Sequence, residues 1–119
     1  MVTYAIGGAI LEITAQGNYT TAEIAATFAD AKRDPGLPTA PRLLLIDFKG
    51  SQANPSFADL ETRWRLIQQL EPSRIAFLVA TVAQARLAQL YEGHGAEAGG
   101  APPIKVFQAP EAAREWLKM

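Results

Sequence analysis

The sequence predicts one α/β domain, residues 1–119, built on a single mixed, mostly parallel sheet. Two predominantly apolar runs, at residues 42–48 and 74–80, have the composition of strands buried on both faces. Segments with apolar residues at helical spacing follow each run. The length suits one core that buries roughly two-thirds of the unfolded surface. We expect about five strands and four helices in the order β-β-α-β-α-β-α-β-α.

The N-terminal third predicts a hairpin and a helix. Residues 2–6 and 10–15 are β-prone, and the pair Gly7-Gly8 between them suits a tight turn. Thr20 with Glu23 has the spacing of a capping box, which predicts a helix start. Asp-Pro-Gly at residues 34–36 ends that helix.

The middle of the chain predicts a loop and a second helix. After the strand at 42–48, the polar residues 49–55 read as a loop, and a helix is expected over residues 56–70. Arg63 and Arg65 are expected on its solvent face, and the alternative is that they recognise an acidic partner. Its inward stripe is expected to comprise Phe57, Leu60, Trp64, Ile67 and Leu70.

The C-terminal third predicts a third helix, a short strand and a fourth helix. Thr81 caps the third helix, and residues 92–103 are expected to form a mobile Gly/Ala/Pro-rich loop containing His94. Residues 104–107 form an edge strand, and Pro110 opens the last helix. The third helix is expected to turn inward Ala83, Leu87, Leu90 and Tyr91. The last helix is expected to turn inward Ala113, Trp116 and Leu117.

Composition excludes several classes of function. The absence of Cys excludes disulfides, thiolate nucleophiles and Cys-type zinc sites, and a single His cannot supply a multi-His metal site. Eleven Lys and Arg against twelve Asp and Glu give a net charge of −1, which provides no basic footprint for nucleic acid. We therefore expect no cofactor, no metal and no catalytic activity.

Targeting signals are not apparent in the sequence. The apolar runs at residues 43–46 and 75–80 fall far short of the roughly 20 residues that span a membrane. The first residues carry no basic segment of the signal-peptide type. We expect a cytoplasmic protein without a membrane span.

The most distinctive polar segment follows the strand at 42–48. Ligands of open α/β sheets bind outside the carboxyl ends of the strands, and a helix N-terminus there favours an anion. Ser56 is a candidate phosphoacceptor or anion site together with Asn54. Alternatively, Ser56 is simply the N-cap, or Asn54 is the N-cap with Pro55 as the first helical residue.

The same segment offers a candidate contact surface for a partner. Asp47 ends the strand and either binds a cation or pins the following loop through side-chain-to-backbone hydrogen bonds. Lys49, Gly50 and Ser51 follow it, and Ser51 reads as a turn residue. An enzyme built on Asp47, Ser51 and Ser56 would lack an evident base.

The element order and two segments resemble the STAS domain (sulfate transporter and anti-sigma factor antagonist), in its stage II sporulation AA-like branch. The segments are residues 43–48 and the closing strand and helix at 106–117. The resemblance implies this fold and an anti-sigma factor antagonist-like signalling role. It also implies a phosphorylated hydroxyl at the start of the second helix, which falls on Ser56. Asn54 and Phe57 stand where antagonists have Asp and Gly.

Two functional hypotheses remain from the sequence. The leading one is a regulatory, protein-binding module that uses the 49–56 segment. The alternative is a carrier of a small apolar ligand or lipid, because members of the branch also look similar to lipid-binding domains. A homodimer through sheet edges or Trp-containing helices is a further possibility. The candidate walls of the apolar pocket are Phe77, Leu87, Tyr91 and Trp116.

Overall fold

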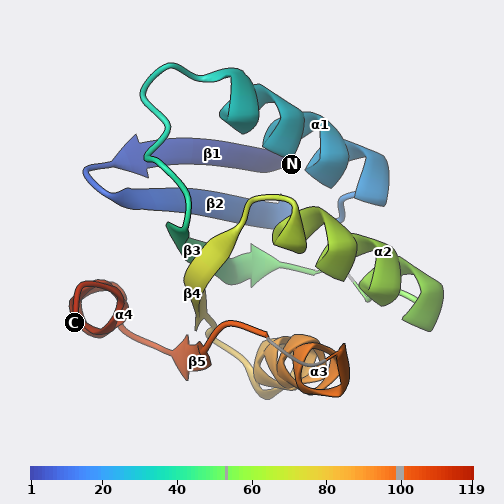
Figure 1. Ribbon diagram of the computed structural model, residues 1–119. Coiled ribbons are helices and arrows are strands. Elements are labelled where there is room, and N and C mark those ends of the chain that lie inside the picture. Colours follow the sequence, from blue (N-terminus) through green and yellow to red (C-terminus); the bar gives the residue numbers. More distant parts are fainter. Residues whose placement is uncertain (53, 99–100) are drawn as a thin grey trace.

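The computed structural model describes residues 1–52, 54–98 and 101–119, except for the side chains of residues 94–98. The element order is the predicted one (Figure 1). The strands are β1 (Val2–Gly7), β2 (Ile10–Gly17), β3 (Arg42–Ser51), β4 (Pro72–Leu78) and β5 (Ile104–Phe107). The helices are α1 (Thr21–Arg33), α2 (Phe57–Gln68), α3 (Val82–Ala98) and α4 (Pro110–Leu117).

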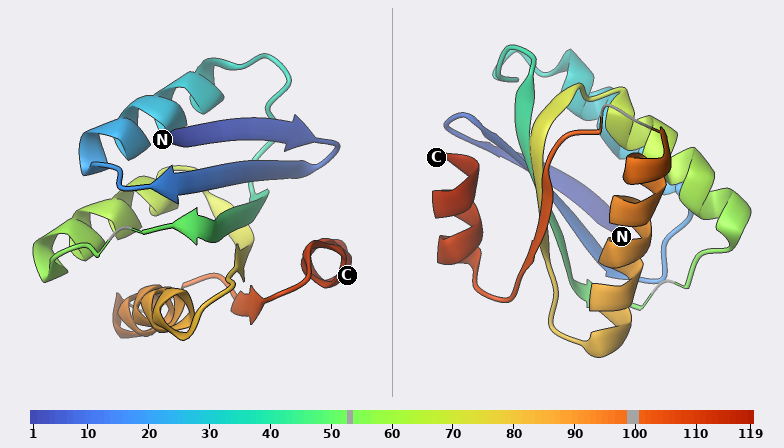
Figure 2. Two further views of the ribbon diagram at one scale, coloured as in Figure 1. Left: turned by 180° about the vertical axis from the view of Figure 1, so that it is seen from behind. Right: turned by 60° about the horizontal axis from the view of Figure 1, so that its bottom comes forward.

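The five strands form one sheet in the order β1-β2-β3-β4-β5. β1 pairs with β2 antiparallel, and the other three pairs are parallel. Since each crossover advances the sheet by one strand in the same direction, right-handed connections place their helices on the same face. Figure 2 shows α1, α2 and α3 on one face and α4 alone on the other. The predicted fold class is confirmed.

The larger core lies between the sheet and the three crossover helices. Alternate residues of the central strands point into it, among them Leu44 and Ile46 of β3. Three aromatic rings, Phe48, Phe77 and Tyr91, stack with centroids 5.3, 5.6 and 6.2 Å apart. Such ring pairs contribute about 0.5–1.5 kcal/mol each beyond their buried area, so this cluster anchors α3 to β3 and β4.

A smaller core lies under α4 on the opposite face. Ala113 and Leu117 of α4 are buried there, with Trp116 packed at its edge. Arg114 Nη2 pairs with Glu12 Oε1 of β2 at 2.6 Å and extends the contact of α4 across the sheet. The alternation of buried and partly buried residues along β2 therefore reflects a strand with one face in the main core and the other only partly covered.

Helix α2 turns most of the predicted face inward, because Leu60, Trp64, Ile67 and Leu70 are buried, but Phe57 and Arg63 depart from the prediction. Phe57 is 74% exposed, because it lies in the first turn of α2, which extends past the end of β3 (Figure 1). Arg63 was predicted on the solvent face but is only 4% exposed. The buried stripe comprises Leu60, Arg63, Trp64 and Ile67, at positions i, i+3, i+4 and i+7 of a helix.

Helix α3 departs from prediction in its face and its length. Ala83 and Leu90 are exposed, whereas Gln84 and Ala88 are buried. The helix continues to Ala98, so most of the predicted mobile loop at 92–103, including the backbone of His94, is helical. Residues 99–100 of that segment and the side chain of His94 lie outside the described residues. Among the described residues, no helix is long and apolar enough to cross a membrane.

Candidate functional site

The polar segment after the predicted strand is partly strand itself. β3 continues through Lys49 and Gly50 to Ser51, which is 9% exposed, so the predicted loop at 49–55 is too long and Ser51 is not a turn residue. The cause is continued pairing with β2, where Gly50 lies opposite Gln16 after a register shift. The Lys49 N–H donates to Asp47 Oδ1 at 2.8 Å, so Asp47 fixes the backbone that follows it.

Ser56 is the N-cap of α2. Its Oγ accepts from the Asp59 N–H at 3.1 Å and donates to Asp59 Oδ2 at 3.0 Å, and the Ser56 N–H donates back to Asp59 Oδ2 at 3.4 Å. These bonds form a capping box, so Ser56 rather than Asn54 caps the helix. The hydrogen bond from the Ser56 side chain holds the pKa of Asp59 below its ordinary value. Asn54 is exposed on the segment before the cap.

Asp59 connects the cap to a buried cation. Thr21 Oγ1 donates to Asp59 Oδ1 at 3.3 Å and accepts from Arg63 Nε at 3.0 Å. Arg63 Nη2 donates to the Tyr19 carbonyl at 3.5 Å, and its guanidinium carbon lies 5.2 Å from the centroid of the Tyr19 ring. A polar chain therefore links the start of α1 to α2.

Gln84, at the start of α3, forms hydrogen bonds with the backbone at the same end of the sheet. Its Oε1 accepts from the Ala80 N–H at 2.7 Å, and its Nε2 donates to the carbonyls of Lys49 and Ser51, each at 3.1 Å. The Gln84 N–H donates to Thr81 Oγ1 at 3.1 Å, which confirms the predicted cap at Thr81. The end of β3 is thus tied to the start of α3.

Two surface grooves flank the turn at Asn54 and Pro55. The first, of about 550 Å³, runs between the starts of α1 and α2 and reaches Asp59 and Arg63. The second, of about 530 Å³, runs towards α3 and reaches Leu90. Both lie at the carboxyl edge of the parallel strands, where α/β sheets bind their ligands.

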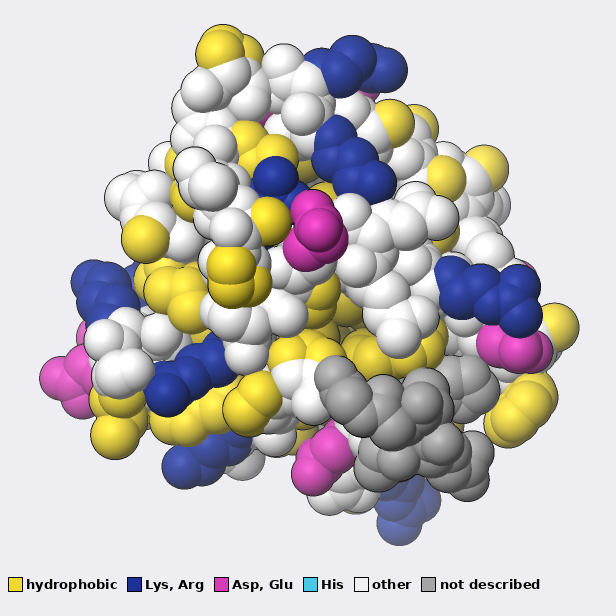
Figure 3. Space-filling model, in the orientation of Figure 1, with side chains coloured by type: hydrophobic (Ala, Val, Ile, Leu, Met, Phe, Trp, Pro, Cys, Tyr) yellow, Lys and Arg dark blue, Asp and Glu magenta, His cyan; other side chains and the backbone are white. Residues whose placement is uncertain are grey.

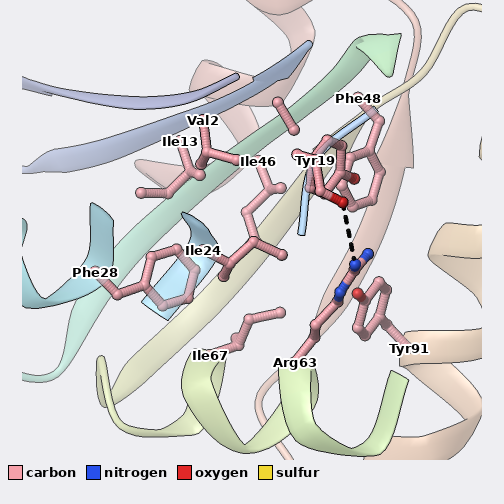
Figure 4. Close-up of a pocket in the computed structure, with 11 residues that line it drawn as sticks. Val2, Ile13, Tyr19, Ile24, Phe28, Ile46, Phe48, Arg63, Ile67 and Tyr91 are labelled. Atoms are coloured by element: carbon pink, nitrogen blue, oxygen red, sulfur yellow. Dashed lines mark hydrogen bonds between the residues drawn. The ribbon is translucent and has the colours of Figure 1, made fainter. Parts of the chain in front are cut away.

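A cavity lies behind Arg63, between the sheet and the crossover helices (Figure 4). Its walls leave about 350 Å³ of empty space, partly open to solvent, but the space is narrow: the centre of a water molecule can occupy only about 20 Å³ of it. Burial raises the pKa of Tyr91 above its ordinary value, and the charge of Arg63 opposes this shift. The lining residues are Val2, Ile13, Ala15, Tyr19, Ile24, Phe28, Ile46, Phe48, Arg63, Ile67 and Tyr91.

The predicted pocket residues do not all come together. Phe77, Leu87 and Tyr91 are buried on the three-helix face. Trp116 packs on the opposite face of the sheet, with its ring centroid 5.8 Å from that of Phe107. Of these four residues, Tyr91 lines the cavity and Leu87 lines the second groove.

Sequence reasoning did not identify Arg63 or Gln84 as site residues. The signal available for Arg63 was its place at i+3 from Leu60 and i−4 from Ile67, which puts a charged residue on an apolar stripe. Figure 3 shows side chains of both charge signs interspersed over the face it displays. On that face, the surface therefore gives no single-sign patch that would mark a site.

Comparisons with known proteins place the fold. No protein-family model matches the chain, and no curated protein sequence does. A solved structure that matches is an uncharacterised protein of the DUF3478 family with a SpoIIAA-like fold from Shewanella loihica PV-4. The two chains share 18% identity with a TM-score of 0.65, and the match covers 98% of this chain and 92% of that one. This chain therefore has the SpoIIAA-like fold that its sequence resemblance implied.

Proposed function

We propose that this protein is a non-catalytic binding module that holds a small apolar molecule between its sheet and its crossover helices. The observation that supports this role is the cavity behind Arg63. Apart from Arg63, its wall consists of aliphatic and aromatic side chains from β1, β2, β3 and all three crossover helices and from Tyr19. Ligand pockets are typically apolar with a few polar groups placed to orient the ligand.

The dimensions of the cavity restrict the ligand. The space is far smaller than a two-chain lipid requires, and as it stands it has room for about one water molecule. A single short aliphatic chain therefore enters only if the side chains that line the cavity move apart. We therefore narrow the lipid hypothesis to a small single-chain molecule.

Methyl NMR with 1-hexanol as the probe tests this function. Binding in the cavity should shift the methyl signals of Ile13, Ile46 and Ile67, which line it. The methyl signals of Leu45 and Leu117, buried under α4, serve as the internal control and should stay in place. An Ala15→Leu variant should abolish the shifts by filling the cavity, and Ala15→Val provides a milder change if Leu prevents folding. Unchanged Ile methyl signals at millimolar 1-hexanol would exclude this role.

A second candidate function is the protein-binding role, with the surface around the 49–56 segment as its contact site. The observation that favours it is the position of Phe57, which is 74% exposed directly after Ser56, on a segment whose residues Asn54 and Pro55 line two grooves. Large exposed apolar side chains beside grooves are common anchors of protein interfaces. Regulation through Ser56 belongs to this candidate function.

Mass spectrometry of the native protein tests whether Ser56 is phosphorylated. Phosphate would add about −1.5 to −2 charges at pH 7, close to the Asp59 carboxylate that Ser56 now contacts at 3.0 Å. The capping box would then open. Pull-downs with Ser56→Asp and Ser56→Ala should recover different partners, and identical partners for both variants would count against the switch.

A further inference from the structure

Arg63 is a buried cation with incomplete hydrogen bonding. It is 4% exposed and carries five N–H donors. Nε donates to Thr21, and Nη2 reaches the Tyr19 carbonyl only at 3.5 Å. Nη1 is buried and forms no hydrogen bond of good geometry in the described part of the chain, although the guanidinium lies close enough to the Tyr91 hydroxyl to oppose the rise of its pKa. Within that same part, Arg63 forms no ion pair with Asp or Glu.

Two partly buried arginines, Arg42 and Arg114, have acidic partners, and Arg74 donates to the Trp116 carbonyl at 2.6 Å and lies over the Trp116 ring. Arg42 donates to the carbonyls of Pro38 and Leu70 at 2.8 and 2.9 Å, and lies 3.8 Å from the Glu71 carboxylate. Arg114 donates twice to Glu12 Oε1, at 3.0 and 2.6 Å. A buried cation without a counter-charge loses its hydration without full compensation. The condition of Arg63 is therefore not a general property of how this fold accommodates arginine.

The surroundings of Arg63 differ on its two sides. On the groove side, Asp59 is held by Ser56 and Thr21 and contributes negative charge at a distance. On the other side the guanidinium forms one end of the apolar cavity, between Tyr19 and Tyr91 (Figure 4). The missing acceptor thus lies where an apolar space meets a positive charge.

We propose that the ligand of the cavity is a short-chain carboxylate whose head group binds Arg63. This inference rests on the proposed function and names the chemical class of its ligand. The carboxylate accepts from Nη1, with the Tyr91 hydroxyl as a neighbouring donor, and the aliphatic tail extends towards Ile13, Phe28 and Ile67. Arg suits a planar carboxylate. A phosphate dianion fits less well, since one free nitrogen and one phenol compensate a single charge better than two.

Isothermal titration of the protein with hexanoate, 1-hexanol and acetate separates the contributions of head and tail. Wild type should bind hexanoate about 10- to 100-fold more tightly than 1-hexanol, the range expected for a charge-assisted hydrogen bond. Arg63→Met should remove that preference, and cooperative unfolding of the variant in urea shows that it is folded. Arg65→Met is the matched control, because Arg65 lies exposed on the same helix and pairs with Glu61; it should bind hexanoate like wild type.

The outcomes distinguish the two proposals. Equal binding of hexanoate and 1-hexanol by wild type, or an unchanged preference in Arg63→Met, overturns the carboxylate assignment and leaves the apolar function standing. Acetate binding as tight as hexanoate supports an anion site at Arg63 and contradicts the apolar contribution. Failure of both hexanoate and 1-hexanol to bind overturns both proposals.

Discussion

Replacing Arg63 by Met should leave the stability of the protein almost unchanged. The substitution removes one good hydrogen bond to Thr21, a second at 3.5 Å and the contact with the Tyr19 ring. A hydrogen bond from a charged group contributes about 1.5–3 kcal/mol, and an Arg–aromatic contact about 0.5–2 kcal/mol. Against these losses stands the desolvation of a buried cation, several kcal/mol, which Met does not incur. We expect the free energy of unfolding to change by less than about 1 kcal/mol.

Arg42→Met provides the comparison, because Arg42 has two short hydrogen bonds to backbone carbonyls and an acidic neighbour. Its replacement should lower the free energy of unfolding by about 2–4 kcal/mol. Equilibrium unfolding in urea measures both variants, with the slope checked for two-state behaviour. A loss above about 3 kcal/mol for Arg63→Met, or equal losses for the two variants, would refute the view that Arg63 is retained for a ligand.

Three further predictions concern the core, the helix cap and pH. Phe77→Ala should cost about 3–5 kcal/mol and lower Tm by about 12–20 °C for a chain of this length in calorimetry; a loss below about 1 kcal/mol would contradict the role of the ring stack. Ser56→Ala should cost about 1 kcal/mol in urea unfolding, and a neutral change would deny the cap its role. Burial raises the pKa of Tyr91 above 10.0, so the unfolded chain loses this proton first. Stability should therefore decline as the pH rises above 10, and less steeply in Tyr91→Phe; parallel pH profiles would contradict this.

The sequence was informative wherever one physical signal acted alone. The apolar runs predicted β3 and β4 because a strand buried on both faces needs no polar side. The capping residue Thr20 was identified correctly, and Ser56 was one of the two caps that the sequence allowed for the second helix, since these hydrogen bonds are local to the first helical turn. Local rules thus account for the order of the elements and for most of their starts.

The candidate site depends on long-range contacts that local patterns do not reveal. Arg63 meets Thr21 across 42 positions of the chain, and Gln84 meets Ser51 across 33. Both are polar residues in buried positions, so a prediction that places polar side chains on the surface is wrong for them. Leu90 shows the converse, because it is apolar yet 55% exposed on the rim of a groove.

The sequential strand order has a consequence for how the chain folds. Every strand pairs only with strands next to it in the sequence, so each pairing closes after one hairpin turn or one helical crossover. The chain therefore loses conformational entropy in several short loop closures rather than in one long closure. During synthesis, each new strand can therefore pair with the strand that precedes it in the sequence, which has already left the ribosome. Folding can advance in the direction of translation, and α4 completes the molecule by covering the second face last.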